Sequence, residues 1–315
     1  MPLAAQQYPP YLFVDGAGHL FPAGSGSPLG SNPPYAECYT VVAGATVPCD
    51  FTGLGGETYC ARVDQAPYNA KCDNSTDDYT AINTALQAGL SCIALPPTTQ
   101  GNTVACKFGT GLVDNGGTTI EGNNSLLVYT GTSGVALTCA SFEPCEFDDI
   151  GLSLTASSGT VGGILLQRGS FTTMKNTDST IQNSPFVGFT SLEIDGAWAD
   201  IDLGLFDGTV KIDTTNSGLI AGVHFRNAFI GPAAGVWPKL IDVTQQNTPI
   251  TFTNSVFVMQ GSTSGTDCVV CVNNTGAPLG GSAPLKLDNV ALYTTNTFTG
   301  NVINGASSGG GKTPV

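Results

Sequence analysis

The chain has 315 residues, of which only 11% are charged, and its 24 acidic and 10 basic side chains give a formal net charge of -14 at pH 7. Phosphate backbones and anionic lipids repel such a chain, which argues against nucleic acid and membrane surfaces as partners. No apolar run reaches the roughly 18 residues of a membrane-spanning helix, and the opening MPLAAQQYPPYLFVDG lacks the basic and apolar segments of a signal peptide. The 41 glycines and many β-branched residues favour short strands joined by turns over a helical bundle.

Residues 1–71 are rich in Pro, Gly and Tyr and predict a small β-rich N-terminal region. Two hairpins are expected within it. The first turns on Asp15-Gly16 in YLFVDGAGHLF, and the second covers residues 38–49.

The cysteines occur in close couples along the chain, and an even number in such couples is typical of disulfides formed in an oxidising compartment. The couple at 38 and 49 is favoured because the predicted hairpin places its two residues opposite each other. Ten buried thiols are the alternative, and no second ligand pair supports a zinc site, so no metal or cofactor is expected. In sequence order the expected pairs are Cys38 with Cys49, Cys60 with Cys72, Cys92 with Cys106, Cys139 with Cys145, and Cys268 with Cys271.

The stretch CDNSTDDYTAINTAL predicts a single amphipathic helix over about residues 77–88. Thr76 or Asp77 can cap its first turn, and Gly89 can end it. The apolar stripe of this helix would consist of Ile82, Ala85 and Leu86.

From residue 90 onward, short strands recur with a loose repeat in which Asn or Asp is followed by apolar residues. Asn tolerates the left-handed conformation of a tight bend, and stacked Asn amides can form hydrogen bonds from one coil to the next. Coils of roughly 20 to 35 residues predict a parallel β-solenoid over residues 72–305, with an interior ladder of polar residues. The members of this ladder would be Asp149, Asn183, Asn227, Asn254 and Asn289.

The helical stretch continues into CIALPP and then into NTVACKFGTGLVDNGGTTIEGNN. Through Thr76-Asp77-Asp78, Leu95-Pro96-Pro97 and Ile120-Glu121-Gly122, this segment resembles the entry segment of the pectate-lyase-like superfamily of right-handed parallel β-helices, although Asn74-Ser75 replaces the usual Gly-x step. The resemblance implies that the helix covers the N-terminal end of the solenoid, whose apolar interior would otherwise meet water.

The same entry segment is frequent in bacteriophage tailspikes, which carry a small N-terminal attachment region before a trimeric β-helix. The resemblance therefore implies a homotrimeric virion protein that binds other virion proteins through residues 1–71 and meets the host surface polysaccharide. Such a protein would be extracellular after lysis, and residues 306–315 would form a flexible tail. Two alternatives stay open: a polysaccharide depolymerase, and a capsid or tail decorating protein that binds no receptor.

The densest acidic stretch, LEIDGAWADIDLGLFDG, supplies the candidates for catalysis. Glycosidases need two carboxylates about 5 to 10 Å apart, and Trp198 could serve as a sugar-stacking platform. A solvated acidic face is the alternative interpretation, and His224 is expected to face outward beside Arg226. If Leu192, Ile194, Ile201 and Leu203 point inward, the alternation turns Glu193, Asp195, Asp200 and Asp202 outward. The catalytic candidates are Glu193, Asp195 and Asp202.

Overall fold

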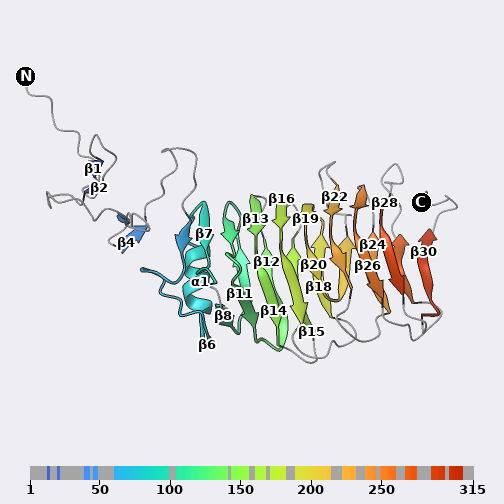
Figure 1. Cartoon of the computed structure of the whole chain (residues 1–315), viewed down its shortest axis with the longest axis horizontal. Coiled ribbons are helices and arrows are strands. Elements are labelled where there is room, and N and C mark those ends of the chain that lie inside the picture. Colours follow the sequence, from blue (N-terminus) through green and yellow to red (C-terminus); the bar gives the residue numbers. More distant parts are fainter. Residues whose placement is uncertain are drawn as a thin grey trace, which may run out of the picture.

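The described residues from 60 onward form an elongated rod with one short helix at its N-terminal end and strands along the rest of its length (Figure 1). No helix in the part of the chain that the structure describes is long and apolar enough to cross a membrane. The computed structural model describes four short strands before residue 60 and residues 60–98, 104–140, 143–155, 160–167, 171–181, 189–213, 222–231, 238–245, 249–259, 267–274, 285–294 and 298–307.

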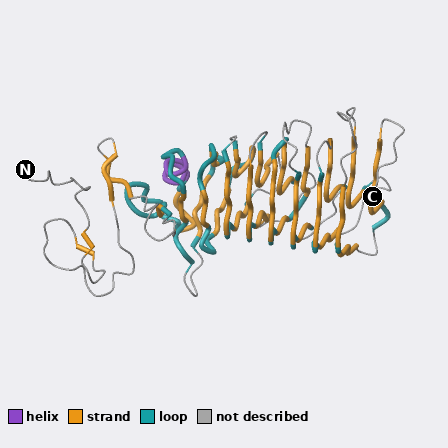
Figure 2. Tube along the Cα trace, turned by 90° about the horizontal axis from the view of Figure 1, so that it is seen from above, coloured by secondary structure: helices purple, strands orange, loops and turns teal. Residues whose placement is uncertain are grey.

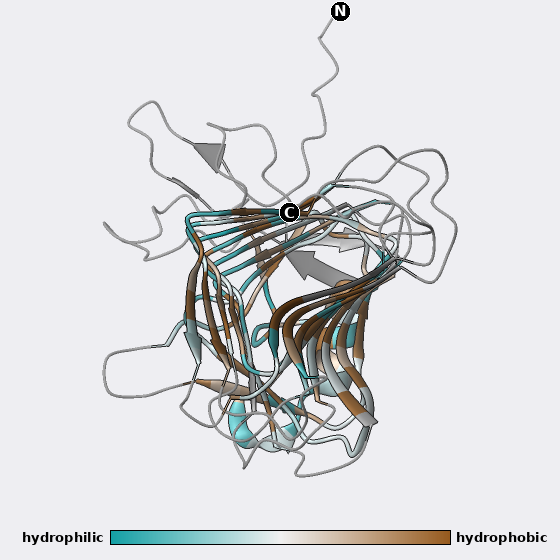
Figure 3. Ribbon diagram, turned by 90° about the vertical axis from the view of Figure 1, so that its right-hand side faces the viewer, coloured by the Kyte–Doolittle hydropathy of each residue, from teal (hydrophilic) through white to brown (hydrophobic). Residues whose placement is uncertain are grey.

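Three parallel sheets form the sides of the rod, and the chain visits them in turn before it begins the next coil. Viewed along the rod, successive coils superimpose and enclose an apolar interior (Figure 3). This arrangement is a parallel β-helix, so the predicted fold class is confirmed.

Each strand pairs in parallel with the strands one coil before and one coil after it. Sheet 1 contains β5 (Ala61–Arg62), β7 (Cys92–Ala94), β10 (Thr119–Glu121), β13 (Pro144–Asp148), β16 (Phe171–Lys175), β19 (Trp198–Asp202), β22 (Val223–Arg226), β25 (Ile250–Thr253) and β28 (Leu285–Asp288). Sheet 2 contains β6 (Asp73–Asp77), β8 (Ala105–Phe108), β11 (Leu126–Tyr129), β14 (Gly151–Leu154), β17 (Asp178–Ile181), β20 (Leu205–Phe206), β23 (Phe229–Ile230), β26 (Val256–Met259) and β29 (Ala291–Thr294). Sheet 3 contains β9 (Leu112–Asp114), β12 (Ser133–Cys139), β15 (Thr160–Leu166), β18 (Thr190–Asp195), β21 (Thr209–Asp213), β24 (Lys239–Gln245), β27 (Cys268–Asn274) and β30 (Asn301–Ser307).

The core consists of columns of apolar side chains that repeat once per coil. Phe225 and Phe252 stack with ring centroids 4.6 Å apart, while Phe206 and Phe257 of sheet 2 approach these two rings edge-on. Burial of each such side chain contributes about 2 to 3 kcal/mol. The inward column of sheet 1 consists of Ile93, Ile120, Phe147, Met174, Ile201, Phe225 and Phe252, all buried and in register.

Both predicted N-terminal hairpins are present: β1 (Phe13–Val14) pairs antiparallel with β2 (Leu20–Phe21), and β3 (Tyr39–Val42) with β4 (Ala45–Pro48). The residues of their turns lie outside the described residues. The solenoid begins before residue 72, because β5 already pairs in parallel with β7. At the other end β30 runs to Ser307, so the strand continues past residue 305 into the segment predicted to be a tail.

The capping helix α1 (Tyr79–Leu86) is shorter at both ends than predicted and lies at the N-terminal end of the rod (Figure 2). Its N-cap residue is Asp78 rather than Thr76 or Asp77, although Asp77 Oδ1 accepts a hydrogen bond from the Tyr79 amide at 3.0 Å. Gly89 follows the helix with a φ of +69°. The helix also docks on sheet 3, because Gln87 Nε2 donates to the Val113 carbonyl at 3.0 Å. The predicted stripe of Ile82, Ala85 and Leu86 is buried.

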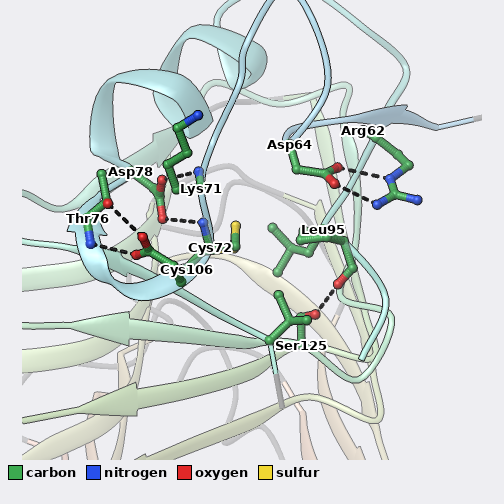
Figure 4. The surroundings of a disulfide bond; sticks show 12 residues. Arg62, Asp64, Lys71, Cys72, Thr76, Asp78, Leu95, Cys106 and Ser125 are labelled. Carbon is green, nitrogen blue, oxygen red and sulfur yellow. Dashed lines mark hydrogen bonds and ion pairs between the residues drawn. A yellow bond between two sulfur atoms is a disulfide. The ribbon is translucent and has the colours of Figure 1, made fainter. Parts of the chain in front are cut away.

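Disulfides tie neighbouring coils together at the capped end (Figure 4). The predicted couples Cys60 with Cys72 and Cys92 with Cys106 are wrong, because the bonds join Cys60 to Cys92 and Cys72 to Cys106. Each of these bonds links a residue to the coil that follows it, since stacking brings the two strands side by side. The couples Cys139 with Cys145 and Cys268 with Cys271 are confirmed. Cys38 and Cys49 lie outside the described residues.

A left-handed residue follows sheet 1 strands at the corner that leads to sheet 2. The column lies at the outer surface and not in the interior as predicted, because its residues are mostly exposed. Asn183 lies outside the described residues, and the corner position of its coil belongs to Asn176, whose Nδ2 donates to Asp149 Oδ1 at 2.5 Å. Asn289 Nδ2 donates to Asn254 Oδ1 at 2.8 Å. From β13 onward the column consists of Asp149, Asn176, Leu203, Asn227, Asn254 and Asn289, with φ between 46° and 57°.

The first prediction concerns Asn254. Replacement by Val should destabilise the protein by about 2 kcal/mol, because a β-branched residue tolerates the left-handed conformation poorly and Asn289 loses its acceptor. Urea unfolding should show this loss as a lower midpoint. Asn254→Asp, which keeps an acceptor and tolerates the bend, should lose less stability. Equal stability of the Val variant and the wild type would contradict a structural role for this corner.

Candidate functional site

The predicted acidic stretch is divided between two sides of the rod. Glu193 and Asp195 lie on β18 in sheet 3, whereas Asp200 and Asp202 lie on β19 in sheet 1. A corner at Gly196, with a φ of +68°, separates them. All four point outward as predicted, because Leu192, Ile194 and Ile201 are buried between them.

Leu203 contradicts the predicted alternation. It was expected to point inward, but it occupies the left-handed corner position and is 50% exposed. Asp207, the last acidic residue of the stretch, is buried at the end of β20.

Charged side chains of both signs gather on the outside of sheet 3. Glu193 forms an ion pair with Lys211 of the next coil. Asp195 and Asp213 are register neighbours on adjacent strands, which lie about 4.8 Å apart. The sheet 3 face is defined here as Glu193, Asp195, Lys211, Asp213, Lys239 and Asp242.

Two lysines bind the carboxylates of this face. Lys239 Nζ lies 2.8 Å from Asp242 Oδ2, and Asp242 is also the register neighbour of Lys211. Burial alone would lower the pKa of Lys211. The hydrogen bond and charge of Glu193 and the charge of Asp195 outweigh this effect and raise the pKa. Lys211 therefore stays charged at neutral pH and holds the acidic row together.

The outside of sheet 1 carries an aromatic side chain among polar ones. Trp198 is half-buried at the start of β19, directly after the corner that follows Asp195. Asp200 Oδ1 lies 2.9 Å from Arg226 Nη2, and Asp200 is the register neighbour of His224. The sheet 1 face is defined here as Trp198, Asp200, Asp202, His224 and Arg226.

The side chains of this face are fixed by bonds between coils. Asp202 Oδ1 accepts a hydrogen bond from Asn227 Nδ2 at 2.8 Å. His224 faces outward as predicted, since Val223 and Phe225 on either side of it are buried. The sheet 1 face thus carries an indole ring at the start of β19 and carboxylate, imidazole and guanidinium groups further along β19 and β22. An indole can stack on a sugar ring, and the polar groups can form hydrogen bonds with its hydroxyls.

A second pair of carboxylates lies on sheet 1 nearer the cap. Glu121 and Asp148 are register neighbours on β10 and β13. Burial, and then the charge of Asp148, raise the pKa of Glu121. Lys175 on the next strand lies 3.9 Å from Asp148 Oδ2 and partly balances this charge.

Among the described residues, two clusters of potential metal ligands lie at the capped end, and both include disulfide-bonded cysteines. One contains Cys60 and Cys92 with Glu121, and the other contains Cys72 and Cys106 with Asp78. Thiolates bind metals, whereas disulfide sulfurs are not thiolates.

The carboxylate of Asp78 has a structural role. Its two oxygens accept hydrogen bonds from the amides of Lys71 and Cys72, at 2.6 and 3.0 Å (Figure 4). These bonds fix the segment that enters the helix.

Four charged residues of the sheet 3 face were not predicted as site residues: Lys211, Asp213, Lys239 and Asp242. Period-2 alternation in TVKID and KLIDV would have turned Lys211, Asp213 and Asp242 outward. Which of these side chains lie beside Glu193 and Asp195 depends on the number of residues in each coil, and the sequence pattern alone does not give that number.

The chain matches no family model, no curated protein and no solved structure. Its function is therefore inferred from geometry and chemistry.

Asp114 is a buried acid beneath the cap, on β9 next to Cys139 of the following coil. Its Oδ1 accepts a hydrogen bond from the Gly116 amide at 2.8 Å, and its Oδ2 has no hydrogen-bond partner among the described residues. Desolvation outweighs this hydrogen bond and raises the pKa of Asp114 to about 6. The ionised form is therefore disfavoured in the fold, and stability should fall as pH rises from about 4 through 6.

The second prediction concerns this acid. Asn at position 114 cannot ionise, so Asp114→Asn should gain about 2 to 3 kcal/mol relative to wild type between pH 4 and pH 8. Chemical unfolding of both proteins at these two pH values measures the change. A difference between them that is the same at pH 4 and pH 8 would contradict the prediction.

Proposed function

We propose that this protein is an attachment spike of a bacteriophage virion, with a β-helix of the pectate-lyase-like kind that binds polysaccharide on the host surface. In this proposal three copies form the spike, and the N-terminal region (residues 1–71) docks it on other virion proteins. The spike then works outside the cell after lysis.

One observation carries the glycan-binding part of the proposal: Trp198 lies on the same outer face of sheet 1 as the polar groups further along β19 and β22. A sugar ring presents an apolar side and a rim of hydroxyls, and an indole beside fixed carboxylate and guanidinium groups complements both. The ion pair between Asp200 and Arg226 and the hydrogen bond from Asn227 to Asp202 fix the polar groups before any ligand binds. Such preorganisation lowers the entropy cost of binding.

Disulfides and charge support an extracellular setting. Four disulfides join all the cysteines from Cys60 to Cys271 that the structure describes. Such bonds persist where the surroundings are oxidising. A net charge of -14 also disfavours non-specific adhesion to nucleic acid released from lysed cells.

The sheet 3 face favours a second candidate function, depolymerisation of the same polysaccharide. Asp195 and Asp213 are register neighbours, so their strands lie about as far apart as the two carboxyl groups of a retaining glycosidase. Glu193 is held by Lys211 and is less suited to proton transfer. In this candidate function Trp198 would hold the chain while the two aspartates cleave it.

The third prediction concerns the sugar platform. On an array of bacterial capsular and O-antigen polysaccharides, the purified chain should bind at least one polymer. Trp198→Ala should weaken that binding at least tenfold, about 1.4 kcal/mol. Trp198→Phe keeps an aromatic ring and should retain part of the binding, while Lys286→Ala, on the same sheet in the last described coil, should bind as wild type does. Undiminished polysaccharide binding by the Trp198→Ala variant would contradict the role of Trp198 as a sugar-stacking platform.

Released reducing ends, measured on the same polymers, separate the two candidate functions. Release that is abolished by Asp195→Asn and by Asp213→Asn would favour the depolymerase. Binding without release would favour the attachment spike.

The fourth prediction concerns location. Antibodies against the solenoid should label intact phage particles at discrete projections when the particles are viewed by electron microscopy. Deletion of residues 1–59, which precede the first solenoid strand, should leave the purified solenoid folded while its incorporation into particles is lost. Uniform labelling of the capsid would favour the decorating protein instead.

A further inference from the structure

The outside of sheet 2 carries apolar side chains where the other two sides carry charge. On β20, β23 and β26 the inward residues Phe206, Ile230 and Phe257 are buried, so the alternate positions face out. The apolar stripe is defined here as Leu203, Leu205, Phe229, Val256, Ala291 and Tyr293.

The stripe runs along the rod over four coils, and a column of four of its residues is in register from coil to coil. Leu205 is in register with Phe229, Phe229 with Val256, and Val256 with Ala291. Phe229 is 38% exposed and Tyr293 is 61% exposed. Contiguous apolar surface of this kind marks an interaction site more often than isolated exposed residues do.

Four consecutive sheet 2 strands carry no charge along their described residues. The strands β20, β23, β26 and β29 read LF, FI, VFVM and ALYT and contain no charged residue. Beside β20 and β23 the other two sides of the rod carry the sheet 1 face and the sheet 3 face, with their ion pairs. In the coil of β26 the strands β25 and β27 contain no charged residue either.

Leu203 is a second, independent sign that this surface is used. Every other corner residue from β13 onward is Asn or Asp, yet the corner beside β20 has a leucine with a φ of +57°. A non-glycine residue pays about 1 to 2 kcal/mol for this conformation, and Leu203 also leaves half of its side chain in water. It cannot accept a ladder bond, so Asn227 turns to Asp202 instead. Leu203 therefore does not stabilise the corner, and we attribute it to a contact made by the outer surface.

We propose that the apolar stripe is the surface on which copies of this chain pack side by side, parallel and in register. The inference deepens the proposed oligomer and rests on it. A peptide that adds a strand to a sheet needs an open edge, but β20, β23 and β26 are each paired on both sides. The partner must therefore meet the side chains of the face.

A second copy fits this surface for two reasons. Another β-helix that lies parallel to the first repeats its side chains at the same rise per coil, so each apolar residue meets an apolar residue along the stripe. Copies with a net charge of -14 repel each other, and they can approach most closely where neither carries charge.

The fifth prediction is that Phe229→Asp disrupts this packing. Sedimentation equilibrium of the full chain should show self-association at micromolar concentration, and the variant should raise the dissociation constant at least a hundredfold with an unchanged circular dichroism spectrum. Thr251→Asp adds the same charge to a neighbouring coil on sheet 1 and should associate as wild type does. Wild-type protein that is a monomer at about 100 µM, or a Phe229→Asp variant that associates normally, would overturn the proposal.

Leu203→Asn keeps the proposal testable if the Asp variant does not fold. It should raise the melting temperature, because Asn suits the corner, and it should weaken association at least threefold. A merely structural role for Leu203 predicts lower stability without a change in association, and that result would overturn the proposal.

Cysteine cross-linking tests orientation. In parallel copies, Leu205→Cys and Tyr293→Cys should each form a disulfide with the same residue of the partner copy. Cross-links only between a Leu205→Cys chain and a Tyr293→Cys chain would overturn the parallel arrangement. Polysaccharide binding by a protein that stays monomeric would contradict the proposed role of the apolar stripe but support the receptor-binding function. Self-association without polysaccharide binding would support the role of the stripe but contradict the receptor-binding function.

Discussion

In-register pairing between coils is the constraint on which the rest of this structure depends. Within the three sheets, each strand between the end strands is hydrogen-bonded to the strand one coil before it and the strand one coil after it, so most residues lie beside the residue at the same position of the neighbouring coil. A position that suits one coil must therefore suit its neighbours. This is why Phe225 stacks on Phe252, why Asn289 bonds to Asn254, and why Cys60 reaches Cys92.

Sequence reasoning correctly predicted mainly those contacts that join residues close together in the sequence. The helix, its buried residues and the bonds Cys139–Cys145 and Cys268–Cys271 follow from local spacing, whereas the fold class follows from a repeat along the chain and from the resemblance of the entry segment. The pairs Cys60–Cys92 and Cys72–Cys106 could not be found this way, because each joins residues a full coil apart. Pairing each cysteine with the next one in the sequence predicts the correct disulfide only where a short turn brings the two residues together.

Asn176 was missed for a different reason. The repeat was recognised by apolar residues that follow the Asn within a few positions, but Thr177-Asp178-Ser179-Thr180 follow Asn176 and none of them is apolar. Thr177 is nevertheless buried, because its Oγ1 donates to the Phe147 carbonyl at 3.2 Å and so satisfies its polar group inside the rod. The candidate site was found in part for a similar reason: alternation predicted which acids point outward, while the corner at Gly196 decides which of them meet.

Stability and recognition occupy different parts of this rod. The interior columns, the corner and the disulfides fix the coils, so the three outer sides can differ in chemistry without changing the fold. Sheet 3 carries paired charges, sheet 1 carries an indole among polar groups, and sheet 2 carries apolar side chains. Leu203 lies where these demands conflict, because the corner favours Asn and the adjoining face favours an apolar residue. A residue that departs from its column at a cost to the fold identifies the side of the rod on which contacts matter most.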